Sequence, residues 1–477
     1  MSTDARSGGL RVAAKPSLEE WLLLLESRHP RGEAGIELGL ARVRQVGAAL
    51  GHFGDSGRLP ACPLLTIAGT NGKGSTAAFL EAILHRAGYR VGCYASPHLL
   101  RYNERVRVGG VPVEDAALCA AFAQVEAARR AAGDVFLTYF EFGTLAAWQV
   151  FAAAGCEVLI LEVGLGGRLD AVNLYDPDVA LVTSIDLDHQ DWLGATREAI
   201  GREKAGIFRA GRPALCGDAQ PPEGLVAHAA SLGAPLQVLG RDFGVAGDET
   251  GGFSPAGETP PQWRYWHRQE DRTTRRVLAH PALRGAAQLK NAALALAALE
   301  TLGTRLPVSM QAIRQGLAEA HLPGRFQVLP GRPVVVLDVG HNPEAMRVLA
   351  QNLASMGFYP KTRAVLGMLA DKDVRGIAAL RGKVDHWFLT SLPGPRGLCA
   401  TELARRVAAV DAQTPITCCA TPLDAFAQAL AASEETDRIL IFGSFLTVAP
   451  VLADGNCPAG EGLISGRAVR QPGASSR

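Results

Sequence analysis

The residues best suited to chemistry lie in one short stretch, where an apolar run (64–68) leads into a turn rich in glycine. That turn carries one lysine, Lys73, and the hydroxyls of Ser75 and Thr76 then open a helical pattern. Glycines let backbone N–H groups close on an anion, and a helix N-terminus adds roughly half a positive charge. The lysine suits terminal phosphates, and the first hydroxyl suits Mg²⁺. The stretch therefore predicts a nucleotide site of P-loop type, although Gly74 separates Lys73 from Ser75.

Three further stretches of the first half combine polar side chains with strand ends or helical turns. Glu162 follows four apolar residues, 158–161, and burial there favours a cationic partner, either Mg²⁺ or a neighbouring Arg or Lys. His189 stands among three aspartates after the next strand, where a metal-binding role and a structural role are both open. Lys204 lies in a helical turn beside apolar residues, and this setting by itself favours a solvated or ion-paired lysine.

The second half of the chain contains two similar strand ends. In one, Asp338 and His341 precede a helix start at 342–344, and in the other Ser444 follows the apolar run 439–442. Each alone is compatible with simple turn chemistry, but together they predict a polar, functional edge on a second sheet. No GxSxG elbow, HExxH helix or ordered Ser/His/Asp set stands out, so the sequence gives no support to a hydrolase triad.

Strand-type runs alternate with helical patterns along most of the chain, which predicts right-handed βαβ units. In the first half the expected strands are 64–69, 91–95, 157–163 and 179–185, and the expected helices are 17–27, 75–88, 115–132, 141–154 and 196–208. Helical periodicity returns at 286–302 and 308–320, before a second series with strands at 334–339, 363–367, 386–390 and 438–442. Residues 246–276 break the pattern and are expected to form a peripheral insertion or a small antiparallel excursion.

A chain of 477 residues is too long for one core, so we expect an α/β protein of two domains. The first is an N-terminal P-loop ATPase-type domain with a mostly parallel sheet, and the second is a smaller, Rossmann-like C-terminal α/β domain. Pro and Gly at 322–325 predict the boundary. The expected division is a mobile tail at 1–16, domains at 17–322 and 323–455, and a second tail at 456–477.

Composition gives no support to a partner recruited by charge or to a secreted, disulfide-bonded protein. The 48 basic and 47 acidic residues nearly cancel, which gives no support to a nucleic-acid or membrane partner recruited by charge. Nine scattered cysteines without a CxxC favour reduced thiols and a cytoplasmic location. The polar N-terminus lacks the apolar region of a secretory signal.

These motifs, in this order, resemble the Mur ligase superfamily, and within it the folylpolyglutamate synthase/dihydrofolate synthase family. The resemblance runs from about residue 18 to residue 451. Its blocks are Gly69–Ser75, Ser96–Leu99, Thr138–Glu141, Glu162–Asp170, Asp188-His189, Trp192–Gly194, Gly201–Gly206, Leu322–Phe326 and His341–Pro343. Two others, Gly367–Asp373 and Gly394–Gly397, resemble the bacterial bifunctional branch. One departure is Leu446, which stands where this branch commonly has a histidine.

The resemblance assigns roles to individual residues. It implies an ATP site formed by Asn71, Gly72, Lys73, Gly74, Ser75, Asn291, Arg325 and Asp338, and one or two Mg²⁺ ions held by Ser75, Ser96, Glu162 and His189. Lys204 matches a lysine that is carbamylated in the family, which requires a neutral amine. The pterin side would be formed by Ser27, Arg28, His29, Pro30, Thr138, Tyr139, Phe140, Glu141, Leu169, Asp170 and Ala171, and the glutamate side by His341 and Ser444. The implied catalytic set is Lys73, Glu162, His189, Lys204 and His341.

The implied activity is ATP-dependent amide bond formation through an acyl phosphate. The expected substrates are dihydropteroate, tetrahydrofolate polyglutamates and L-glutamate, and the expected state is a monomer. A folylpolyglutamate synthase with that single activity is the nearest alternative, and another Mur-type amide ligase is a more distant one. A P-loop kinase or regulatory ATPase would leave the polar edge of the second sheet unexplained. A binding module would not need Glu162, His189 and Lys204 around one phosphate loop.

Overall fold

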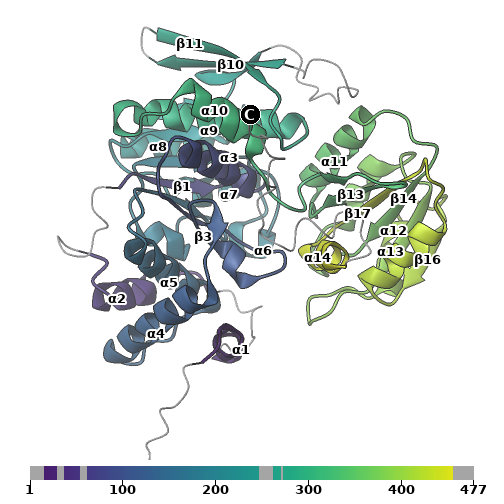
Figure 1. The fold of residues 1–477 in the computed structure, drawn as a ribbon, viewed down its shortest axis with the longest axis horizontal. Coiled ribbons are helices and arrows are strands. Elements are labelled where there is room, and N and C mark those ends of the chain that lie inside the picture. Colours follow the sequence, from purple (N-terminus) through teal and green to yellow (C-terminus); the bar gives the residue numbers. More distant parts are fainter. Residues whose placement is uncertain (1–15, 29–36, 54–61, 247–261, 270–271, 455–477) are drawn as a thin grey trace, which may run out of the picture.

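Two mostly parallel sheets dominate the computed structural model, which describes residues 16–28, 37–53, 62–246, 262–269 and 272–454 (Figure 1). The tails predicted at 1–16 and 456–477 lie outside the described residues, apart from Pro16. One sheet belongs to the first half of the chain and the other begins at Gln327, so the predicted α/β fold class is confirmed. The boundary between 322 and 323 stays a prediction.

The N-terminal sheet has eight strands in the order β4-β3-β2-β5-β1-β6-β7-β8. Strands β2, β5, β1, β6, β7 and β8 run parallel, whereas β3 and β4 form an antiparallel edge. Because β1 and β5 are buried along their whole length, they consist mostly of apolar residues, and β5 ends in the carboxylate of Glu162. The strands are β1 Leu64–Ala68, β2 Val91–Tyr94, β3 Val106–Val108, β4 Val111–Pro112, β5 Val158–Glu162, β6 Val179–Val182, β7 Ala214–Cys216 and β8 Leu236–Val238.

Helices cover both faces of this sheet, and a separate apolar cluster lies on each face. Helices α1, α4 and α5 contribute to one cluster, and α3, α9 and α10 contribute to the other (Figure 1). The helices are α1 Leu18–Arg28, α2 Ala41–Ala49, α3 Lys73–Arg86, α4 Asp115–Ala131, α5 Tyr139–Ala153, α6 Gln190–Leu193, α7 Arg197–Ala205, α8 Glu223–Leu232, α9 Ala286–Leu302 and α10 Met310–Glu319, with short 3₁₀ turns η2 Tyr102–Arg105, η3 Ala171–Leu174 and η4 Gly303–Arg305.

The segment expected to break the pattern contributes to a three-stranded antiparallel sheet in the order β11-β10-β9. It lies above α9 and α10 in Figure 1, so the antiparallel excursion at the periphery is confirmed for the described part. Its strands are β9 Phe243–Ala246, β10 Gln262–Gln269 and β11 Arg272–Ala279.

The C-terminal sheet has six strands in the order β12-β13-β17-β14-β15-β16, of which only β12 runs antiparallel to its neighbour. Its elements are β12 Gln327–Leu329, β13 Val334–Asp338, α11 Pro343–Ser355, β14 Thr362–Leu366, η5 Val374–Leu380, β15 His386–Thr390, α12 Ala400–Ala408, β16 Ile416–Cys419, α13 Pro422–Ala431, β17 Arg438–Phe442 and α14 Phe445–Ala453. Among the described helices of the chain, none has the length and apolar character needed to cross a membrane.

Several boundaries differ from the predictions by a few residues, and two of them lie at the phosphate loop and the loop that it contacts. The helix expected from residue 75 already begins at Lys73, since Gly72 adopts a left-handed conformation with φ of 89° that ends the turn. The strand expected to reach residue 185 ends at Val182. Beyond it, Thr183 Oγ1 donates to the carbonyl of Asn71 at 2.6 Å, and the carbonyl of Ser184 accepts from the Thr70 amide at 2.8 Å.

Candidate active site

The phosphate loop occupies the space between β1 and α3, and its glycines are required by their neighbours. Gly69 has a φ of 149° and lies so close to Thr183 that no Cβ would fit. Gly72 lies close to the side-chain amide of Asn291 on α9, where a Cβ would also be crowded. A side chain at either position would displace the loop, so the close approach of β6 and α9 shapes the cradle. Its backbone N–H groups and the N-terminus of α3 form a site suited to phosphate.

Lys73 and Glu162 both lie at the base of this cradle, where their charges interact without forming an ion pair. Lys73 Nζ donates to the carbonyl of Gly69 at 3.0 Å, and burial lowers the pKa of Lys73 although Glu162 opposes the shift. Burial also raises the pKa of Glu162, while Lys73 acts in the opposite direction. The Ser96 amide donates to Glu162 Oε2 at 3.4 Å, and within the described residues no cation lies at ion-pair distance from this carboxylate. Such a buried, weakly satisfied carboxylate fits a bound cation.

His189 faces the same cavity, which has a volume of about 140 Å³ and is also lined by Lys73, Ser96, Glu162 and Lys204. It adopts a left-handed conformation with φ of 50° before α6, and burial lowers its pKa to about 4. The ring is therefore neutral at physiological pH, which is the form that binds a metal. In the part of the chain that the structure describes, no three His, Cys, Asp or Glu side chains form a metal cluster. A cation here would need serine hydroxyls among its ligands, and this mixed donor set fits Mg²⁺.

Lys204 contradicts the interpretation of a solvated or ion-paired lysine. Its residue is 3% exposed, and burial lowers the pKa of its amine to about 7. The cause is packing of α7 against the loop after β5, where Gly167 approaches the carbonyls of Glu203 and Lys204. Nothing in the local sequence shows this contact. The resulting partly neutral amine is the form that carbamylation requires.

The expected ATP residues surround a second cavity of about 340 Å³, lined by Asn71, Gly72, Gly74, Ser75, Asn291, Arg325 and Asp338 among others. Arg325 lies over the ring of Phe445 at 5.5 Å. Asp338 accepts from the amides of Phe326 at 2.9 Å and Gly340 at 2.7 Å, while burial raises its pKa. Both halves of the chain therefore contribute to this cavity.

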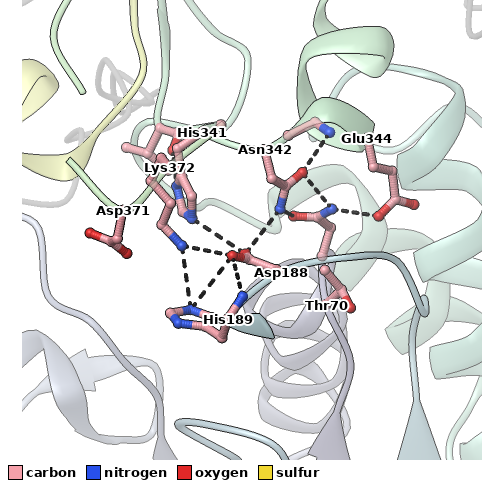
Figure 2. Close-up of polar contacts among 12 residues, drawn as sticks. Thr70, Asp188, His189, His341, Asn342, Glu344, Asp371 and Lys372 are labelled. Atoms are coloured by element: carbon pink, nitrogen blue, oxygen red, sulfur yellow. Dashed lines mark hydrogen bonds and ion pairs between the residues drawn. The ribbon is translucent and has the colours of Figure 1, made fainter. Parts of the chain in front are cut away.

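Asp188 is the centre of a polar cluster that joins the two halves (Figure 2). Its carboxylate accepts from Lys372 Nζ at 2.7 Å and from Asn342 Nδ2 at 3.2 Å, and His341 Nε2 lies 3.8 Å away. Burial alone would raise the pKa of Asp188, but Lys372, His189 and His341 together hold it well below its usual range. The cluster brings His189 and His341, which are far apart in the sequence, to opposite sides of one carboxylate (Figure 2).

A second contact between the halves occupies the phosphate loop itself. The side chains of Asn71 and Asn342 exchange hydrogen bonds at 3.2 and 3.0 Å, and Asn71 also donates to Glu344. Ser184 Oγ donates to the same Glu344 carboxylate at 3.1 Å. Sequence reasoning gave no role to Asp188, Asn342, Glu344 or Lys372. The charged run 371–373, between β14 and η5, was the signal available for the last of them.

The Lys372–Asp188 pair allows a direct test, since its side chains are only 6% and 12% exposed. We expect Lys372→Met to lower the free energy of unfolding by about 3–5 kcal/mol, because it leaves a buried carboxylate without its cation. Adding Asp188→Asn should recover part of this loss. Urea denaturation of the single and double variants measures both effects.

Arg375→Met provides the matched control, because Arg375 pairs with Asp373 at 2.9 Å at a fully exposed position. It should leave stability unchanged. A double variant less stable than Lys372→Met would contradict this account of the cluster.

Most of the expected pterin-side residues line a larger cavity, of about 620 Å³: Thr138, Tyr139, Phe140, Glu141, Leu169, Asp170 and Ala171. Asp170 accepts from the amides of Leu165 at 2.9 Å and Val172 at 3.0 Å, and burial raises its pKa to about 7. Glu141 caps α5 through Thr138 and pairs with Arg42 at 2.8 Å. Leu446, the departure noted in the sequence, lines this cavity too.

Some expected residues lie elsewhere. Ser27 and Arg28 do not line the large cavity; Arg28 pairs with Glu126 at 2.9 Å, so its charge holds α1 against α4. His29 and Pro30 lie outside the described residues. Ser444 is 5% exposed and caps α14 by accepting from the Leu446 amide at 3.2 Å. Its hydroxyl thus has a structural partner and lines none of the three cavities described above.

Comparison with known families shows which family the chain belongs to. Residues 67–214 match the Mur ligase middle domain, and residues 324–445 match the Mur ligase glutamate ligase domain. The Escherichia coli (strain K12) protein named dihydrofolate synthase/folylpolyglutamate synthase is 44% identical over 442 residues, which cover 92% of this chain and 96% of the relative. The chain belongs to the dihydrofolate synthase/folylpolyglutamate synthase family of Mur ligases.

Solved structures of this family superimpose over nearly the whole chain. The structure of E. coli FolC in complex with DHPP and ADP has a TM-score of 0.81 and 43% identity, and covers 91% of this chain and 97% of its own. A bifunctional folylpolyglutamate synthase/dihydrofolate synthase with Mn, AMPPNP and L-glutamate bound has a TM-score of 0.79 and 44% identity, with coverage of 92% and 99%. The family thus includes proteins that hold a nucleotide, a divalent metal and glutamate.

Proposed function

We propose that this chain uses ATP to join L-glutamate to dihydropteroate and to tetrahydrofolate polyglutamates. One observation carries the proposal: Ser96 and Pro97 line both the small cavity of Lys73, Glu162 and His189 and the large cavity of Phe140 and Asp170. A flat heterocycle in the large cavity would therefore extend its carboxylate toward the phosphate loop. The family relatives support the same pair of activities through their names.

The nucleotide would lie along the 340 Å³ cavity, with its terminal phosphates on the loop at 71–74 and its remaining contacts to Asn291, Arg325 and Asp338. Ser75, Ser96, Glu162 and His189 would hold Mg²⁺. When bound, that cation neutralises phosphate oxygens, as expected for phosphoryl transfer. Lys73 adds a fixed positive charge at the same place, so its contribution is largest when charge develops on the transferred phosphoryl group.

The reaction would proceed in two steps. A carboxylate oxygen of the pteroate or folate attacks the γ-phosphorus, the bond to the bridging β–γ oxygen breaks, and ADP and an acyl phosphate result. The amine of glutamate then attacks the acyl carbon, and inorganic phosphate leaves as the amide forms. Positioning and charge neutralisation dominate such chemistry.

The glutamate would enter through a fourth cavity, of about 390 Å³, lined by His189, His341, Lys372 and Arg396. The Nδ1 of His341 lies 2.9 Å from the carbonyl of Val339, to which it donates when the ring is neutral. Burial lowers the His341 pKa to about 4, which leaves Nε2 as an acceptor. A ring with so low a pKa is a weak base, so His341 would orient the amine rather than remove its proton.

Phosphate release tests the proposal and separates the two activities. The protein is assayed with ATP, Mg²⁺ and L-glutamate, offering dihydropteroate in one reaction and tetrahydrofolate in the other. We expect release with both acceptors. Release with tetrahydrofolate alone would support the alternative of a folylpolyglutamate synthase with a single activity, and release with neither would overturn the proposal.

A further inference from the structure

Arg105 is a cation of the large cavity to which neither the sequence motifs nor the proposed mechanism gives a role. It lies at the end of η2, half-buried, and lines the cavity beside Tyr139 and Ser96. Its carbonyl accepts from the Ala95 amide at 2.9 Å, because β2 and β3 are paired there. Arg105 therefore stands opposite the residue that precedes Ser96. This position is beside the passage from the large cavity to the phosphate loop.

The Arg105 guanidinium is held in place by uncharged partners. It lies 5.3 Å from the ring centroid of Tyr102 and 5.4 Å from that of Tyr139, and its Nε donates to His98 Nδ1 at 2.8 Å. Burial, with a further contribution from Arg105, lowers the His98 pKa to about 4, so the ring is a neutral acceptor. These contacts fix the plane of the guanidinium while its terminal N–H groups keep their donor capacity.

The charge of Arg105 lacks a carboxylate at ion-pair distance within the described residues. The other arginine of this lining, Arg396, differs, because it pairs with Asp371 at 2.8 Å. A preoriented guanidinium that faces a ligand cavity and has no counter-ion among the described residues has the geometry for binding a carboxylate in a bidentate manner.

The two acceptor substrates differ in the carboxylates that they bring. Dihydropteroate has one carboxylate, and it is the group that reacts. A folate that already carries a glutamyl residue reacts through its terminal γ-carboxylate and also carries an α-carboxylate that does not react. A cation that lies between the large cavity and the phosphate loop, rather than at the loop itself, therefore has a carboxylate to bind only when the acceptor is a glutamylated folate.

We propose that Arg105 binds the non-reacting α-carboxylate of glutamylated folates and thereby supports chain extension selectively over the first glutamate addition. This inference rests on the proposed function, and it deepens that function by assigning one acceptor class to one residue. Arg105 acts as a specificity residue, since it contacts a part of the acceptor remote from the reacting atoms.

The test compares both acceptors in Arg105→Gln, which removes the charge and keeps a donor for His98. We expect the KM for tetrahydrofolate to rise by about 10- to 100-fold while the KM for dihydropteroate and both kcat values change little. Arg105→Lys should restore part of the loss, because it returns the charge without the planar fork. Arg101→Gln is the matched control, since Arg101 is exposed, pairs with Asp115 at 3.1 Å and does not line the cavity.

Equal losses with both acceptors, or no change with either, would overturn the inference. A second measurement needs no variant: the unaltered protein should use a tetrahydrofolate α-carboxamide with a KM raised by the same factor. Equal use of the acid and the amide would also overturn it. Because every comparison is made against dihydropteroate, a failure of the proposed function appears separately, as inactivity of the unaltered protein with both acceptors.

Discussion

Lys73→Ala is expected to lower kcat for both acceptors by about 10³-fold, the largest effect of any single substitution considered for this protein. Lys73 is the cation of the phosphate loop, and its amine is oriented by the carbonyls of Gly69 at 3.0 Å and Thr70 at 3.4 Å. Alanine removes the charge that would stabilise the transferred phosphoryl group. Lys73 is also the group that most lowers the pKa of Glu162 against the effect of burial. Without it, the pKa of that carboxyl should rise further.

Steady-state phosphate release measures the change, and circular dichroism verifies that the variant is folded. Lys361→Ala is the matched control, because that lysine is exposed and its side chain lines none of the described cavities. The thermal shift produced by ADP should be much smaller in Lys73→Ala than in the control. Activity within a few-fold of the unaltered protein would remove Lys73 from the site.

Lys204→Ala is expected to lower kcat by about 10²- to 10³-fold, through loss of a carboxylate made from its amine. Carbamylation forms a bond between Nζ and the carbon of CO₂ and releases a proton, so it needs the neutral amine. Burial lowers the Lys204 pKa to about 7, so the neutral fraction grows as the pH rises through that value. Activity should therefore fall as the pH drops below about 7, and added bicarbonate should restore part of it.

Carbon NMR with ¹³C-labelled bicarbonate gives a readout besides activity, because a carbamate carbonyl should be seen in the unaltered protein and be missing from Lys204→Ala. Lys383→Ala, at a half-buried position after η5, should keep both the signal and the activity. A short carboxylic acid such as formate should partly rescue Lys204→Ala by filling the place of the carbamate. An unaltered protein without the carbamate signal would contradict this role.

Strand ends and loops were predictable because their signals are local. An apolar run that ends in glycine and lysine identifies the phosphate loop, and the run that ends at Glu162 identifies β5. Parallel strands place their carboxyl ends at one edge of a sheet, so a common site for Lys73, Glu162 and His189 followed from topology alone. In the structure, Lys73, Glu162 and His189 line one cavity.

Polar residues at helix ends were harder to interpret, since the same residue types serve structure and binding. Ser444 matched a binding motif, yet its hydroxyl accepts from the backbone of α14. Arg28 likewise belongs to an expected binding block, yet its charge is paired with Glu126. The sequence gives the type of a residue but not the group that it contacts. Here Ser444 and Arg28 both contact groups of the protein itself.

By itself, the sequence determined the α/β class, the two series of strands and the polar edge of each sheet. Only the tertiary structure decided how the two edges face each other. Asp188 meets Lys372 across 184 positions of sequence, and the burial that lowers the Lys204 pKa comes from packing of α7 on the loop after β5. The physical reason is that contact partners and desolvation depend on packing between distant segments, which has no local pattern.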